Sequence, residues 1–212
     1  GKTDNNTNLQ FLKDMFGTLN NESTKRCIIS TITRHSAAGE NIPFFKKIIH
    51  SDDTDSVRGK AASELGELND PTAIDVLLKI AKNDHSLKVR LKAVNALEEL
   101  NFPAAVDALA DIAKTANNKH VRKKAVDCLG DVGTKRAGEA LQEIVFSDTT
   151  MDIQRKAVNA FEDLPGNDGV PYLIKVAKTH PRSYIRKKAL NCLGESKDPR
   201  AIKAIKDIAL GK

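Results

Sequence analysis

A repeat of 32 residues is the feature that most constrains the fold of this chain. The segment VRGKAASELGEL at Val57 returns without insertions as VRLKAVNALEEL at Val89, VRKKAVDCLGDV at Val121, IQRKAVNAFEDL at Ile153 and IRKKALNCLGES at Ile185. A fixed period of this length is typical of repeat architectures, in which neighbouring copies stack to bury a continuous core. The chain is therefore expected to fold as an array of similar units.

Each period contains two apolar patterns with helical spacing. Ile74, Leu77 and Ile80 share one face of a first helix, and Val89 and Leu97 share one face of a second. Aromatic residues make up only 4% of the chain and Trp is absent, so the core consists of Leu, Ile, Val and Ala. These residues suit helix packing better than a β-sandwich. The repeating unit is therefore predicted to be a helical hairpin in an all-α protein.

The repeats are expected to form a single domain over residues 9–210, with about six helix pairs and a terminal helix. Residues 1–8 are interpreted as a flexible N-terminal segment. An apolar, aromatic-rich stretch over residues 9–19 precedes the first copy, which begins near Thr24 with a shift of one position, and the two together resemble a capping repeat. Residues 199–210 have the pattern of a first helix.

The segment [VI]-R-x-K-A-x-x-x-L-G, the paired helices and the period of about 30 resemble HEAT repeats, specifically the HEAT-like repeats of the phycobilisome-lyase type. The resemblance covers nearly all of residues 9–210. It implies an α-α superhelix, a solenoid of helical hairpins whose second helices line the concave face. For function it is unspecific, because similar repeats occur in scaffolds, chromophore lyases, a metal-dependent hydroxylase and DNA glycosylases.

Three polar columns run along the predicted second helices, turned away from their apolar faces. The lysine ladder consists of Lys60, Lys92, Lys124, Lys156 and Lys188. The asparagine ladder consists of Ser63, Asn95, Asp127, Asn159 and Asn191, and the acidic ladder of Glu67, Glu99, Asp131, Asp163 and Glu195. Lysines near a helix N-terminus and carboxylates near its C-terminus both oppose the helix dipole, at about 0.3–1 kcal/mol each. Helix stability therefore does not explain this arrangement.

Two interpretations of the ladders remain open. In the first, they form a banded polar groove for an extended peptide or a helix, where lysine binds an acidic group and asparagine bonds the peptide backbone as donor and acceptor. The partner-binding residues would then be Lys60, Lys92, Lys124, Lys156, Lys188, Asn95, Asn159 and Asn191. In the second interpretation, the lysines bond neighbouring carbonyls and acids and link one repeat to the next.

A column of arginines, one position after the first residue of each segment, is predicted to be structural. Its members are Arg58, Arg90, Arg122 and Arg186. The HEAT resemblance implies that such an arginine pairs with a loop aspartate, for which the matches here are Asp53, Asp84 and Asp148. Two departures stand against this pairing. The fourth copy has Gln154, and the loops before Arg122 and Arg186 lack the aspartate.

Charge is distributed unevenly along the chain, whose net charge is +6. From Lys119 onward, 19 basic and 12 acidic residues give +7, whereas the residues before it, with 15 basic and 16 acidic, give −1. The basic half suits an acidic protein partner or a nucleic acid backbone. No run of about 18 apolar residues occurs, so no membrane span is expected. The chain begins at Gly1 rather than Met, which leaves the compartment open.

The sequence carries no signature of a catalytic or metal site. None of the five histidines is followed by Glu, so the His-Glu metal pairs of the hydroxylase branch are missing, and HExxH, P-loop and GxSxG motifs are absent. The glycosylases stack a damaged base on aromatic side chains, including Trp, which this chain lacks. A chromophore lyase needs an apolar groove, whereas the predicted groove is charged. We therefore expect no enzyme activity, catalytic residue, metal or cofactor.

The function that the sequence favours is a non-enzymatic protein-protein interaction scaffold. It would bind a partner protein or peptide with acidic groups on its concave face, as a monomer. A nucleic-acid-binding module that uses the basic C-terminal half is the alternative, although an acidic residue lies two turns from every ladder lysine and would repel phosphate. A chromophore-lyase-like protein ranks third.

Overall fold

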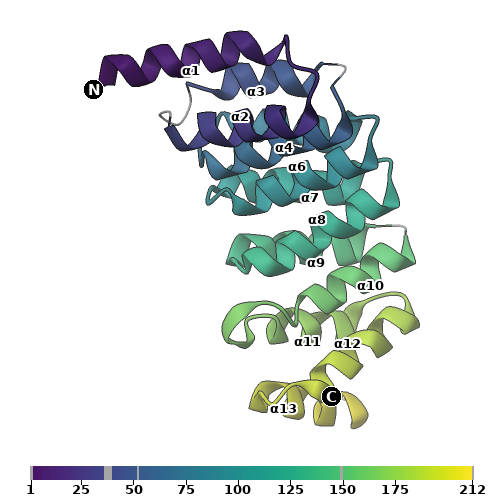
Figure 1. The fold of residues 1–212 in the computed structure, drawn as a ribbon. Helices are drawn as coiled ribbons and strands as arrows, with labels where there is room; N and C mark the ends of the chain where they lie inside the picture. Colours follow the sequence, from purple (N-terminus) through teal and green to yellow (C-terminus); the bar gives the residue numbers. More distant parts are fainter. Residues whose placement is uncertain (1, 36–39, 52, 149, 212) are drawn as a thin grey trace. The chain divides into compact units, whose positions relative to one another are not determined.

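The computed structural model describes residues 2–35, 40–51, 53–148 and 150–211, with side chains from Thr7 onward in the first helix. In these ranges the chain forms thirteen α-helices, one short 3-10 helix and no strand (Figure 1). The all-α prediction is confirmed. The number of helices also equals the six pairs and one terminal helix expected from the period.

First and second helices of the pairs alternate along the chain. The first helices are α1 (Lys2–Phe16), α3 (Ile42–Ile49), α5 (Ala73–Asn83), α7 (Pro103–Thr115), α9 (Lys135–Ser147) and α11 (Val170–Thr179). The second helices are α2 (Glu22–His35), α4 (Asp55–Glu67), α6 (Leu87–Glu99), α8 (Lys119–Val132), α10 (Met151–Ala160) and α12 (Ser183–Glu195). The 3-10 helix η1 (Pro165–Asn167) lies between α10 and α11, and α13 (Pro199–Ala209) ends the array.

The chain divides into two compact units, residues 1–108 and 109–212, with the boundary inside α7. In the first unit α4 packs against α2 and α6, and in the second unit α10 packs against α8 and α12. Second helices thus stack on second helices within each unit, as the repeat pattern predicts. The expectation of a single domain over residues 9–210 stays a prediction.

The apolar columns of the sequence form the core of each unit. The buried columns are Val57, Val89, Val121, Ile153 and Ile185; Ala61, Ala93, Ala125, Ala157 and Ala189; and Leu65, Leu97, Leu129, Phe161 and Leu193. Every member is fully buried apart from Phe161, which is 1% exposed. Truncation of such a side chain costs about 2–5 kcal/mol in free energy of unfolding. The small alanine column lies between two larger ones, where it lets second helices approach each other closely.

The N-terminal helix is longer than the sequence indicated. Residues 2–8, interpreted above as a flexible segment, belong to α1. Leu9 and Phe16 are buried, and the Phe16 ring meets Phe44 of α3 edge-on with centroids 5.4 Å apart. Phe11 is instead exposed. Only one face of this helix therefore contributes to the core of the capping repeat.

Side-chain caps mark several helix starts at the positions that the sequence favours. Thr54, Asn118, Thr134 and Asp198 each accept a hydrogen bond from a backbone N–H in the first turn of the helix that follows. These bonds satisfy donors that the helix itself leaves free. Among the helices described, none has both the length and the apolar character that crossing a bilayer requires.

Candidate partner-binding surface

In the first unit the ladder residues lie on α4 and α6. Lys60 is half-buried, and its Nζ lies 2.5 Å from Oε1 of Glu64, one turn further along α4. Lys92 on α6 is exposed, and its charge partly opposes the rise in the pKa of Glu99 that burial causes at the other end of the helix. The two lysines of this unit therefore differ, because one already neutralises a carboxylate of its own helix and the other faces solvent.

In the second unit one ladder lysine joins two repeats. Lys156 of α10 forms an ion pair with Asp127 of α8, which occupies the asparagine-ladder position of the preceding copy. Both side chains are partly exposed, so the pair contributes little to the free energy of unfolding, about 1 kcal/mol at most. Lys124 and Lys188 are half-buried. The linking interpretation thus has direct support at Lys156, and whether the ladder binds a partner stays a prediction.

The asparagine ladder contains two exposed amides and one half-buried amide. Asn159 and Asn191 are exposed, and the structure gives neither side chain a hydrogen bond to another described residue. Asn95 is half-buried, and its Oδ1 is inaccessible to solvent and has no hydrogen-bond partner within the described part of the chain. The two exposed amides keep both donor and acceptor available for a peptide backbone.

The acidic ladder is crowded at the C-terminal ends of α4 and α6. Burial raises the pKa of Glu99, and the neighbouring carboxylates of Glu67, Glu98 and Glu64 raise it further. The helices come this close because Gly66 has no side chain. A Cβ there would lie 2.8 Å from the backbone oxygen of Ala96. Negative charge therefore accumulates at this end of the first unit.

The arginine column links consecutive repeats, as the sequence indicated. Arg58 is buried and its Nη2 contacts Asp84 Oδ1 at 3.2 Å, in the loop before the next second helix. The same atom donates to Asp55 Oδ1 at 2.8 Å, and Nη1 donates to the carbonyl oxygen of Asp53 at 2.5 Å. This guanidinium is therefore surrounded by acceptors from two successive loops, as a buried charge requires.

A second arginine of the column makes the same link in the second unit. Arg122 of α8 forms an ion pair with Asp148, and its Nε donates to the carbonyl oxygen of Ala113 at 2.7 Å. In both units the aspartate follows its arginine by 26 residues. The aspartate that pairs with each arginine thus lies in the loop after it, so the missing aspartate in the loop before Arg122 does not argue against the pairing.

The fourth copy replaces this ion pair with a neutral one. Gln154 is buried and donates to the carbonyl oxygens of Val145 and Asp148, both at 2.8 Å. The residue 26 positions later is His180, whose Nε2 lies 3.0 Å from the Val145 oxygen and 3.5 Å from Gln154 Nε2. Neither position of the pair thus carries a guanidinium or a carboxylate, and Gln154 Oε1 accepts a hydrogen bond from Arg182 Nη1 at 2.7 Å.

Two further arginines of the column have other surroundings. Arg186 donates from Nη1 to the carbonyl oxygens of His180 and Pro181, at 2.8 and 2.9 Å. Arg90 has a buried Nε without a hydrogen-bond partner in the described ranges, and the residue 26 positions after it is Ala116, which has no acceptor in its side chain. The Arg–Asp link is thus a feature of individual repeats.

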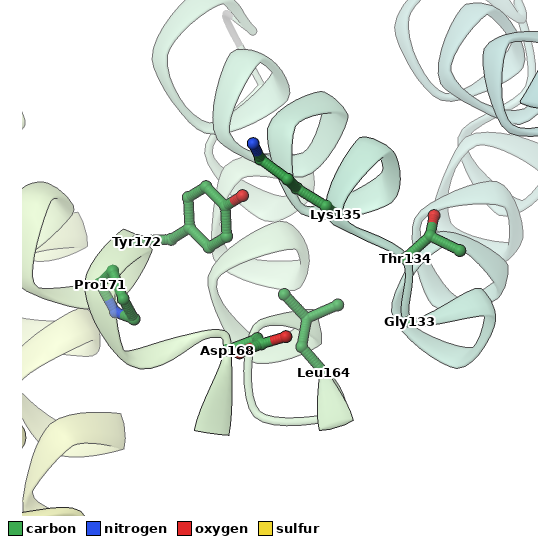
Figure 2. A pocket seen from close by; sticks show the side chains of 7 residues that line it. All are labelled: Gly133, Thr134, Lys135, Leu164, Asp168, Pro171 and Tyr172. Carbon is green, nitrogen blue, oxygen red and sulfur yellow. The ribbon is translucent and has the colours of Figure 1, made fainter. Parts of the chain in front are cut away.

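Two pockets of the second unit lie beside the connection between α10 and α11. The first has a volume of about 250 Å³ and is lined by Gly133, Thr134, Lys135, Leu164, Asp168, Pro171 and Tyr172 (Figure 2). Figure 2 shows the Tyr172 ring and the Lys135 side chain on one side of it, with Asp168 and Leu164 near each other on another. Burial raises the pKa of Tyr172, with Glu139 and Asp168 adding to the effect. Its lining mixes both signs of charge, so it selects no one class of ligand.

The second pocket has a volume of about 300 Å³ and lies at the ends of α10 and α12. It is lined by Phe161, Glu162, Leu164, Asn167, Val170, Leu173, Cys192, Glu195 and Ser196, and we name it the α10–α12 pocket. The sequence analysis did not foresee it. The signal was present in the residues Pro165, Gly166, Gly169 and Pro171, which interrupt the repeat pattern at this one connection.

Comparison with known proteins identifies the family. The model for HEAT repeats matches residues 9–90, 42–118, 77–162 and 144–212, which together span nearly the whole chain. The chain belongs to the HEAT-repeat family. The predicted fold, an all-α solenoid of stacked helical pairs, is thereby confirmed. A search of curated proteins found no match for this HEAT-repeat protein.

Solved structures that are similar to this chain include the following two. Human deoxyhypusine hydroxylase in complex with glycerol is 16% identical, with 95% of this chain and 77% of that chain covered and a TM-score of 0.42. The complex of CpcE and CpcF of phycocyanin lyase from Nostoc sp. PCC7120 is 18% identical, with 92% and 84% covered and a TM-score of 0.47. Within the described part of this HEAT-repeat protein, no group of three or more His, Cys, Asp or Glu side chains could hold a metal ion.

Proposed function

We propose that this HEAT-repeat protein is a non-enzymatic scaffold that binds a protein or peptide segment along its second helices. Asn159 and Asn191 carry the proposal. They recur at one position of the repeat, they are exposed, and their amides make no hydrogen bond with a described residue. A helix gains nothing from asparagine at such a position, whereas an extended peptide backbone matches its donor and acceptor.

The lysine ladder supplies charge complementarity to such a partner. Lys92 faces solvent, and Lys156 is only partly neutralised by the partly exposed Asp127. Ammonium groups next to free amides favour a partner segment that carries acidic groups. Such groups improve the rate and specificity of association more than its final affinity.

A capture experiment with a charge-reversed protein tests the proposal. We expect the triple variant Lys92→Glu, Lys124→Glu, Lys156→Glu to lose the partner captured from source lysate, with the helical circular dichroism spectrum unchanged. The matched control reverses three exposed lysines of first helices and the terminal helix, Lys79→Glu, Lys178→Glu and Lys206→Glu, and should retain the partner.

Two outcomes would contradict the proposal. Equal capture by both triple variants would remove the ladder from partner binding. Unfolding of the ladder variant alone would assign the lysines to the packing of repeats, as Lys156 and Asp127 suggest. The variant Asn159→Ala, Asn191→Ala changes no charge and no ion pair, so its loss of capture in a folded protein separates these cases.

Nucleic-acid binding is a second candidate because the residues from Lys119 onward carry a charge of +7. Part of this charge is already compensated, since Asp152 pairs with Lys119 and lies 3.5 Å from Lys123 and 3.8 Å from Arg155. The test is the affinity for duplex DNA at 50 and 200 mM salt. A steep loss with salt supports this function, and no binding at 50 mM excludes it.

A further inference from the structure

The α10–α12 pocket combines an apolar floor with two carboxylates. Phe161, Leu164, Val170 and Leu173 provide the apolar part of its lining. Glu162 comes just after α10 and Glu195 is the last residue of α12, and both are exposed. The pocket lies wholly within the second unit.

The pocket lies where the glycine column of the repeat is interrupted. Gly66 and Gly130 occupy this column, and a Cβ at either would lie 2.8 Å from Ala96 O or 3.1 Å from Ala160 Cβ, in the next second helix. The copies between and after them carry Glu98 and Glu162 at the same position. Glu162 lies beyond the end of α10, at Ala160, and lines the pocket.

The electrostatics of the pocket favour a cation. Burial raises the pKa of the Cys192 thiol to about 12; the negative charge of Glu162, its hydrogen bond with the thiol and the charge of Glu195 add to the increase, and the positive charge of Lys188 opposes it. Both carboxylates thus act on one point in the pocket wall. The structure gives neither of them an ion pair with a described residue. They form a negative site in the half of the chain that carries a charge of +7, so a cation that binds there is selected by local contacts rather than by the overall field.

We propose that the α10–α12 pocket binds a basic side chain, preferably arginine, of a protein partner. The aliphatic stem lies against Leu164 and Val170, the more exposed apolar residues of the lining, and the guanidinium bonds the carboxylates of Glu162 and Glu195. Arginine suits the site better than lysine because its fork of donors reaches acceptors on two different elements. This inference rests on the proposed function only in that the side chain belongs to a protein partner.

The position of Lys188 adds a spacing to the recognised sequence. Lys188 precedes Glu195 by seven residues on α12, which corresponds to about 10 Å along the helix. An extended peptide covers that length in about three residues. A partner segment that runs along α12 is therefore expected to carry an acidic residue about three positions from its basic residue.

A titration with small probes tests the pocket without knowledge of the partner. The probe is Nα-acetyl-arginine methylamide at millimolar concentration, and Nα-acetyl-norleucine methylamide has a similar stem without the charge. We expect the arginine probe to shift the backbone amide signals of Leu164, Val170 and Cys192 in NMR spectra of the isotope-labelled protein. The norleucine probe should shift them several-fold less at the same concentration.

The variant Glu162→Gln, Glu195→Gln should weaken binding of the arginine probe at least fivefold. The control variant Asp75→Asn, Glu143→Gln changes the net charge equally at exposed positions outside the pocket and should bind as the parent does. The folded state of both is checked by their unshifted signals elsewhere. Equal shifts from the two probes, equal affinity of the two variants, or shifts confined to other residues would each overturn the proposal.

This test and that of the ladders fail separately. The probe titration contains no partner protein, so loss of capture by the lysine variant has no effect on it. If the arginine probe binds and capture of the partner does not depend on the ladders, the pocket proposal is supported and the proposed function of the ladders is contradicted. If capture depends on the ladders and the probe does not bind, the proposed function is supported and the pocket proposal is contradicted.

Discussion

At the scale of single residues, the links between repeats come in matched pairs. Arg58 forms an ion pair with Asp84, and Arg122 forms one with Asp148. In the fourth copy, Gln154 and His180 occupy the equivalent two positions. Removing one partner of a buried charged pair is far more costly than replacing both. In these three copies, although not in those of Arg90 and Arg186, the residue at one position is therefore expected to depend on the residue 26 positions away.

Exchange of the neutral pair for the charged one tests this dependence. We expect Gln154→Arg alone to lower the free energy of unfolding by about 3 kcal/mol or more, because a guanidinium is buried beside an imidazole. The double variant Gln154→Arg, His180→Asp should recover at least about 1 kcal/mol of that loss. Urea unfolding of the parent, both single variants and the double variant measures the coupling. Additive losses would show that the two positions are independent.

The crowded carboxylate of Glu99 predicts a dependence of stability on pH. Its pKa is raised in the folded protein, so the folded state holds the proton more tightly and stability falls as the pH rises from the unfolded pKa through the folded one. Glu99→Gln removes this fall. Because Glu99 is largely exposed, we expect a gain of only a few tenths of a kcal/mol at pH 7. Urea unfolding at pH 3 should show no gain, and a gain at pH 3 equal to that at pH 7 would refute the electrostatic cause.

At the scale of helices, one glycine column sets how closely second helices approach. Gly66 lies against Ala96 of α6, and its equivalent Gly194 at the end of α12 has no atom within 4 Å of an added Cβ. The same substitution at these two sites therefore has different physical consequences. Glu98 and Glu162 are the large side chains of the same column, and Glu162 lines the α10–α12 pocket.

Alanine substitutions in this column should have opposite signs. Gly66→Ala forces α4 and α6 apart, and we expect a loss of about 1–3 kcal/mol in the free energy of unfolding. Gly194→Ala meets no neighbour and improves helix propensity, for a gain of up to about 1 kcal/mol. Thermal or urea unfolding of the two variants provides the measurement. A loss at Gly194 as large as that at Gly66 would mean that helix contact is not the cause.

The sequence predicted the helical elements well and the links between them incompletely. The columns of Val57, Ala61 and Leu65 identified the core, because the buried face of a helix places apolar residues at a regular spacing that can be recognised in a single sequence. The partner of Arg58 was harder to assign. A column of the repeat shows where a residue lies within its own helical pair, but it does not show which loop of the next pair lies beside that residue. The α10–α12 pocket was missed because it depends on the connection between α10 and α11, where Pro165, Gly166, Gly169 and Pro171 interrupt the repeat pattern.

At the scale of the whole molecule, the chain forms two compact units that divide at Ala108. In repeat proteins each repeat contacts mainly its neighbours, so stability is close to a sum of local terms and parts of the array can open separately. A substitution that weakens one unit is therefore expected to affect that unit first.

Equivalent leucines of the two units provide a matched test. Leu65 and Leu129 occupy the same column and are both fully buried. Each change to Ala should cost about 2–5 kcal/mol. We expect Leu129→Ala to accelerate amide hydrogen exchange mainly in residues 109–212, and Leu65→Ala mainly in residues 1–108. Equal acceleration across the chain in both variants would show that the molecule opens as one cooperative unit.

The 26-residue offset of the Arg–Asp links has a consequence for the construction of longer or shorter arrays. A junction placed between Arg122 and Asp148, or between Gln154 and His180, separates matched partners and can leave a guanidinium facing an imidazole. A junction just before a second helix, between Ser86 and Leu87, keeps Arg58 with Asp84 and divides no such pair. Arrays that are joined just before a second helix, whether by gene duplication or by protein engineering, therefore keep their Arg–Asp links intact. The natural module runs from the start of one second helix to the loop before the next second helix.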